Sequence, residues 1–171
     1  MKTIITKRLV LRPYTVQDFT VLHEILSDRE TMRFWPEPFT AEKTANRIKR
    51  SMLSYETNGF GKFAVELKES RKLIGDCGIT LVEIEGKIEN NLGYVLHRTF
   101  HGNGFATEAA AACVNFALGE LRLGRLIASM EVNNKASVRV AEKIGMIKEK
   151  EYYNKKNRGL LTYLYSIAKT G

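Results

Sequence analysis

One short segment organises this chain, and it reads His101-Gly102-Asn103-Gly104-Phe105-Ala106-Thr107-Glu108. The run 91–96 before it has the composition of a strand, and the alanine-rich run after it has that of a helix. A strand, a glycine turn and a helix in this order aim unpaired backbone N–H groups at a point beyond the helix start, where the helix dipole adds positive potential. Glycine permits positive φ and lets an anion approach the backbone, so the segment predicts a phosphate-binding turn.

The turn differs from two common phosphate motifs. No Gly-Lys-Ser/Thr follows it, which excludes a P-loop. A dinucleotide fingerprint requires a third glycine where Thr107 stands, and an acidic residue ending a strand about 20 residues later. The chain has neither. Taken alone, a Gly-x-Gly turn of this kind is more often a plain helix cap than a phosphate site.

A second motif farther along the chain favours the phosphate site. It runs Asn134-Lys135-Ala136-Ser137-Val138-Arg139-Val140-Ala141-Glu142-Lys143-Ile144-Gly145-Met146. Together the two motifs resemble the GNAT superfamily of acyl-CoA-dependent N-acetyltransferases. In that family an Arg/Gln-x-x-Gly-x-Gly/Ala loop binds the pyrophosphate of coenzyme A, and an Asn-x-x-Ser motif follows. Here His101 takes the Arg/Gln place, and Gly104 and Ala106 fit. The start, 7–13, also resembles the RimJ/RimL type, so the resemblance covers nearly the whole chain.

The composition is that of a soluble globular protein, and we expect a single domain over residues 1–171. No apolar run approaches the roughly 20 residues that span a membrane, and an apolar signal region is missing at the N-terminus, so we expect a cytoplasmic protein with no membrane partner.

Cys77 and Cys113 lie in apolar stretches and are expected to be buried thiols, with no metal site. The net charge of +8 suits a polyphosphate cofactor. It would also suit nucleic acid, but no matching motif is present, so no nucleic acid partner is expected.

The hydrophobic pattern predicts a mixed α/β fold. Strands are expected over 8–13, 62–68, 73–84, 88–97, 125–132, 146–153 and 160–168. Helices are expected after the caps Thr15 and Thr40, over 105–121, and from 134 to 144. The strand 125–132 follows a strand–helix unit and should lie parallel to 88–97. The resemblance implies the GNAT fold: a mostly antiparallel twisted sheet of about seven strands, with that one parallel pair splayed at the cofactor site, flanked by about four helices. The loop around Trp35 is expected to be either a lid over the substrate or an aromatic plug on the core.

The resemblance also implies which residues bind acetyl-CoA. The backbone of Val95, Leu96 and His97 would pair with the pantetheine arm like an added strand. Asn134 would hydrogen-bond the arm or a bound water, and it also stands where it can cap its helix. The pyrophosphate would lie on the loop formed by His101, Gly102, Asn103, Gly104, Phe105, Ala106 and Thr107.

Two positions depart from the family pattern at the expected catalytic centre. Many members carry a tyrosine acid four residues after the motif serine, where this chain has Ala141. RimJ/RimL-like chains often place an acid just before Leu-Gly-Tyr, where this chain has Asn91. We therefore expect Ser137 to protonate or stabilise the leaving thiolate, and Asn91 to lie at the catalytic centre without acting as the base. The base stays open: the candidates are ordered water, Asp76, Glu83 and Glu85.

The expected function is transfer of an acetyl group from acetyl-CoA to a primary amine by direct attack in a ternary complex. The acceptor is either a protein N-terminus, such as that of a ribosomal protein, or a small-molecule amine. The alternative is a non-catalytic module that binds or senses acyl-CoA, which Asn91 favours because it cannot accept a proton. The protein is expected to be a monomer or a homodimer.

Overall fold

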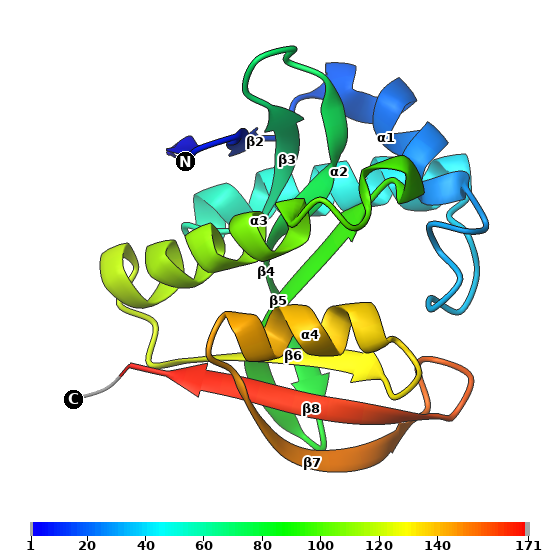
Figure 1. The fold of residues 1–171 in the computed structure, drawn as a ribbon, viewed down its shortest axis with the longest axis vertical. Helices are drawn as coiled ribbons and strands as arrows, with labels where there is room; N and C mark the ends of the chain where they lie inside the picture. The colour runs from blue at the N-terminus through cyan, green and yellow to red at the C-terminus, as the bar shows by residue number, and fades with distance from the viewer. Residues whose placement is uncertain (1, 170–171) are drawn as a thin grey trace.

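The computed structural model describes residues 2–169 as an eight-stranded sheet with helices on both faces (Figure 1). The strands are β1 (Ile4–Ile5), β2 (Leu9–Pro13), β3 (Lys62–Leu67), β4 (Leu73–Ile84), β5 (Lys87–Leu96), β6 (Arg125–Glu131), β7 (Ile147–Asn154) and β8 (Leu160–Ala168). The helices are α1 (Phe19–Ser27), α2 (Ala41–Thr57), α3 (Phe105–Asn115) and α4 (Lys135–Lys143). Shorter helical turns are 3₁₀ at Val16–Asp18 and Arg98–Phe100, and π at Phe116–Glu120.

The predicted sheet, mostly antiparallel with one parallel pair, is confirmed. The strand order is β1-β2-β3-β4-β5-β6-β8-β7, and only β5 and β6 run parallel among residues 2–169. The count is eight instead of about seven because Ile4–Ile5 pairs with Leu11 and Val10 as an edge strand. Two residues are too few to show an alternating pattern. The helix expected over 105–121 ends at Asn115 and continues as the π-helical turn.

Each face of the sheet carries its own apolar cluster. The larger cluster lies under α3 and α4, and the smaller one lies under α1 and α2. In Figure 1, α3 and α4 lie on the viewer's side of the strands, whereas α2 lies behind them. Strand alternation assigns side chains to the two clusters: Phe63 and Val65 join the first, and Ala64 joins the second. By the same alternation Lys62 points to the face covered by α2.

The parallel pair separates soon after it forms. Asn91 and Ile127 are its one paired position, and the remainder of β5 pairs with β4 alone within residues 2–169. The backbone of β5 after Asn91 therefore presents N–H and C=O groups toward the widening gap. After Asn91, the edge of β5 that faces β6 therefore has no strand partner within residues 2–169.

Two glycines of β4 and both cysteines are buried, and the two thiols were expected to be so. Gly75 and Gly78 are close-approach points, since an added Cβ would lie 2.0 Å from the Val95 carbonyl oxygen and 2.3 Å from that of Gly61, respectively. Cys77 and Cys113 are free, buried thiols, with their Sγ atoms 3.5 Å apart. Within residues 2–169, no helix has both the length and the hydrophobicity that crossing a bilayer requires.

Candidate functional site

The loop between β5 and α3 has the backbone geometry of an anion site. Gly102 and Gly104 both take the left-handed conformation, with φ of 80° and 78°, and Gly104 is the N-cap of α3. The first helical hydrogen bond runs from the Glu108 N–H to the Gly104 carbonyl oxygen, at 3.1 Å. The N–H groups of 105–107 therefore have no acceptor within the helix. They border a cleft of about 290 Å³ that the loop lines.

Arg8, the residue just before β2, braces this loop. Its Nη1 donates to the Asn103 carbonyl oxygen (2.9 Å), its Nε pairs with Glu108 (2.7 Å), and its guanidinium lies 4.5 Å from the centre of the Phe105 ring. Glu108 also accepts from the Thr6 hydroxyl at 2.7 Å. Although partial burial raises its pKa, hydrogen bonds from Thr6 and Arg8 bring the Glu108 pKa below its usual value. Glu108 thus ties the start of α3 to Thr6 and Arg8.

Further positive charge surrounds the cleft, and the sequence analysis missed it. Arg33, Arg139 and Lys143 all line this space. Arg139 and Lys143 are four residues apart on α4 and so share one face of the helix, a spacing that was readable in the sequence. A ligand with several phosphate groups fits such a surrounding.

Most of the predicted cofactor residues line this cleft together. They are Val95, Leu96, His101, Gly102, Gly104, Phe105, Ala106, Thr107 and Asn134. His97 and Asn103 do not line it. The His97 Nδ1 accepts from the Thr99 N–H (3.4 Å), and the Asn103 amide donates to the His101 carbonyl oxygen (3.1 Å), so both side chains serve the loop itself.

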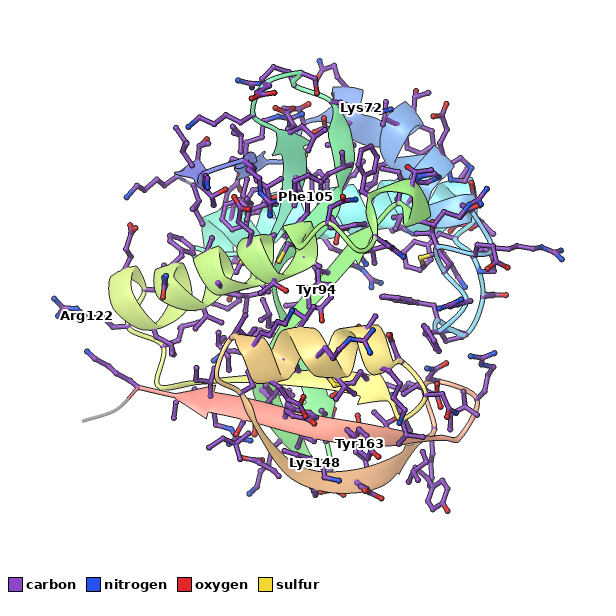
Figure 2. All side chains as sticks on the ribbon, in the orientation of Figure 1. Lys72, Tyr94, Phe105, Arg122, Lys148 and Tyr163 are labelled. Atoms are coloured by element: carbon purple, nitrogen blue, oxygen red, sulfur yellow. The ribbon has the colours of Figure 1, made fainter. Side chains whose placement is uncertain are left out.

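Tyr94, Asn134 and Ser137 meet where the cleft reaches the splayed strands. The Asn134 Oδ1 accepts from the Ser137 N–H at 3.2 Å, which confirms the predicted cap of α4. The Tyr94 hydroxyl donates to the Ser137 carbonyl oxygen at 3.3 Å, and burial raises the Tyr94 pKa. Figure 2 shows Tyr94 between α3 and α4. The Ser137 hydroxyl has no hydrogen-bond partner within residues 2–169, so it is available to a ligand.

A second cavity, of about 330 Å³, adjoins the first. The residues common to both are Phe34, Trp35, Tyr94, Asn134 and Ser137. Asn91 and Gly93 of β5, with Ser129 and Glu131 of β6, line it from the two sides of the splay, and Arg47 of α2 lines it from the helix side. The two cavities therefore adjoin at the gap between β5 and β6.

Trp35 packs on the core, as one of the two expectations had it, and whether its loop acts as a lid stays a prediction. Its ring packs against the smaller apolar cluster and also lines both cavities. The preceding residue, Phe34, accepts a hydrogen bond at its carbonyl oxygen from the Asn157 amide (3.0 Å), which ties this loop to the β7–β8 turn. The Trp35 loop thus forms part of the wall of both cavities.

Asp76 does not fit the role of an accessible base. It is fully buried and accepts from Arg47 Nε (2.5 Å), Arg47 Nη2 (2.7 Å) and the Tyr14 hydroxyl (2.7 Å). Burial alone would raise its pKa, but the charges of Arg47 and Lys62 and the hydrogen bonds from Arg47 and Tyr14 together lower it. The carboxylate is therefore ionised, and both of its oxygens already accept hydrogen bonds. Glu83 and Glu85 line a neighbouring cavity outside the second one, and Glu85 pairs with Lys150.

Two other charged side chains line the second cavity and escaped the sequence analysis. Glu131 is 9% exposed; its Oε1 accepts from the N–H and the amide of Asn133, while Oε2 has no partner among residues 2–169. Lys62 is 5% exposed, and its Nζ donates to the Gly93 carbonyl oxygen at 2.6 Å. Burial lowers the Lys62 pKa to about 8. A lysine at an inward position of β3 was the signal available in the sequence.

Comparison with known proteins supports this description. Residues 8–147 match the family model of the acetyltransferase (GNAT) domain. The uncharacterized N-acetyltransferase YnaD of Bacillus subtilis (strain 168) is 32% identical over 167 residues, which cover 96% of this chain and 95% of that protein. A crystal structure of a GNAT-family acetyltransferase from Bacillus anthracis has a TM-score of 0.82 and 29% identity, with 98% of each chain covered. RimL, a ribosomal L7/L12 alpha-N-protein acetyltransferase solved with coenzyme A, shares the fold at 17% identity, with a TM-score of 0.81 and 98% of each chain covered.

Proposed function

The chain belongs to the GNAT acetyltransferase family, and from this premise we propose that it transfers the acetyl group of acetyl-CoA to a primary amine. The observation that carries the proposal is the pair of adjoining cavities. One contains a helix start and cations suited to phosphates, and the other contains charged side chains suited to an acceptor. They meet at Tyr94, Asn134 and Ser137, where the two substrates would react.

The first cavity would hold acetyl-CoA. The N–H groups of 105–107, together with Arg139 and Lys143, would bind the pyrophosphate. The open edge of β5 from Val95 to His97 would pair with the pantetheine arm, as an added strand pairs with a sheet edge. That RimL, a protein of the same fold, was solved with coenzyme A supports this assignment.

The chain's own side chains would move two protons during direct attack. As the C–N bond forms, the amine proton would pass to Glu131, directly or through water, because its Oε2 is free and lines the acceptor cavity. As the C–S bond breaks, Ser137 would donate a hydrogen bond or a proton to the sulfur. Ser137 lies in the first turn of α4, and a helix N-terminus stabilises a nearby thiolate, so a weak acid suffices there.

We further propose that the protein is of the RimJ/RimL type, with a protein N-terminus or a small-molecule amine as acceptor. The start of the chain supports this, since Arg8 in the segment 7–13 braces the proposed cofactor loop. The non-catalytic alternative gains no support from the relatives, which are named N-acetyltransferases. A cytoplasmic location and a monomeric or dimeric state remain predictions.

Turnover of acetyl-CoA with a panel of amines tests the proposal. Thiol release is followed spectroscopically, and the acetylated amine is identified by mass spectrometry, with an acceptor-free reaction as the control for hydrolysis. We expect at least one amine to yield acetylated product in equal amount to the thiol. Tight binding of coenzyme A without transfer to any amine would favour the sensing module instead.

A further inference from the structure

A buried cluster beside the acceptor cavity holds more positive than negative charge. Lys62, Arg47 and Asp76 lie together on the face of the sheet that α2 covers. Asp76 is the carboxylate of this cluster, and Arg47 and Tyr14 occupy both of its oxygens. Arg47 forms the ion pair with Asp76, whereas Lys62 has no carboxylate within ion-pair distance among residues 2–169, so the cluster keeps a net positive charge.

Lys62 has spare hydrogen-bonding capacity. An ammonium has three donors, and the one acceptor that Lys62 reaches among residues 2–169 is the Gly93 carbonyl oxygen. Gly93 makes room for it, since a Cβ at that position would lie 2.7 Å from the Lys62 Nζ. Lys62 lines both the acceptor cavity and the cavity beside it, so its remaining donors have access to a ligand.

A buried ammonium without a counter-ion is unfavourable because burial removes its hydration. Burial lowers the Lys62 pKa to about 8, and the group therefore stays mostly protonated at neutral pH. An anion that enters the cavity would restore the missing negative charge. A second ammonium at the same place would be repelled.

We propose that the acceptor carries a carboxylate close to its reactive amine, and that Lys62 selects the acceptor by binding this carboxylate. The inference rests on the proposed acetyl transfer and narrows its substrate class. Glu131 lines the same cavity from β6, across the splay from Gly93 and its partner Lys62. The cavity thus offers a carboxylate for the amine and an ammonium for the acid, as a zwitterionic acceptor requires.

Two sources can supply this chemistry. The carboxylate belongs either to a free amino acid or to an acidic side chain at the start of a peptide. Matched pairs separate them: alanine against alaninamide and β-alanine against β-alaninamide test the first source. Asp-Ala-amide against Asn-Ala-amide tests the second, because these two peptides differ in charge at one side chain.

The experiment measures kcat/KM for each pair in the wild type, in Lys62→Met and in Lys68→Met. Methionine keeps most of the length of the unbranched side chain and removes the charge. Lys68 is exposed just beyond the same strand and serves as the matched control. In the wild type and in Lys68→Met, we expect the carboxylate member of at least one pair to be favoured by about 10- to 100-fold, the range of a charge-assisted hydrogen bond. In Lys62→Met this ratio should fall toward one.

Two results would overturn the proposal while leaving acetyl transfer intact. One is equal use of acid and amide by the wild type, and the other is an unchanged preference in folded Lys62→Met. If no amine is acetylated, calorimetry on the coenzyme A complex decides instead. Tighter binding of the acids than of the amides, lost in Lys62→Met, supports the carboxylate site, and equal binding rejects it.

Discussion

Replacing Gly104 by valine would test the proposed pyrophosphate site. Gly104 has φ of 78° and caps α3, and an added Cβ would lie 3.4 Å from the Arg8 Nη2 that braces the loop. A residue with a Cβ pays about 1–2 kcal/mol to adopt the left-handed conformation. At about 2–4 °C per kcal/mol for a chain of this size, the melting temperature should fall by about 2–8 °C.

The expected effect on the ligand is larger than this strain. The bulky side chain would stand beside the N–H groups of 105–107 and displace at least one phosphate contact. A hydrogen bond to a charged group contributes about 1.5–3 kcal/mol, so coenzyme A should bind about 10- to 150-fold more weakly. Calorimetric titration of the folded variant measures this directly.

Gly86 provides the matched control. It has the same φ of 78°, lies in the β4–β5 turn, and has no atom within 4 Å of an added Cβ. Gly86→Val should therefore lose similar stability and bind coenzyme A like the wild type. If folded Gly104→Val also binds like the wild type, the pyrophosphate does not lie on this loop.

Three further changes probe the catalytic centre and its charges. Ser137→Ala should lower turnover by about 10-fold or more while coenzyme A affinity and melting temperature are kept; unchanged turnover would make Ser137 structural and direct the search for the acid to Tyr152 and Tyr153. Asn91→Ala should lower kcat by at most about 10-fold, below the 10²–10⁴ typical of an acid–base residue, and a loss near 10³ in a folded variant would assign Asn91 to the proton transfer. The Lys62 pKa is about 8 when folded and 10.5 when unfolded, so between these values the unfolded chain binds more protons and stability rises with pH. Urea denaturation should show this rise, of up to about 3 kcal/mol, in the wild type relative to Lys62→Met, and parallel pH profiles would contradict it.

The local pattern was sufficient for much of the fold. Both ends of β4 were predicted correctly because its apolar run lies between two turn signals, at 69–71 and 85–87. The phosphate loop was predicted because its glycines must adopt φ values that other residues avoid. The edge strand Ile4–Ile5 was missed, since its pairing depends on β2 and not on its own sequence.

The charged side chains of the acceptor cavity depend on contacts between distant segments. Asp76 was open as a base in the sequence, and only its pairing with Arg47 of α2 shows that it is structural. Lys62 is buried, which is unusual for a lysine, because β3, β4 and α2 come together around it. Glu131 ends β6, and its place in the wall of the second cavity follows from the splay of β5 and β6. No local pattern encodes such pairings.

A crystal structure of the protein with coenzyme A tests the central claim most directly. The account predicts that the pyrophosphate lies on the N–H groups of 105–107, that the pantetheine arm runs along the open edge of β5, and that the thiol lies beside Ser137 at the junction of the two cavities. Coenzyme A bound elsewhere, or bound with its thiol away from Ser137 and the acceptor cavity, would contradict the account.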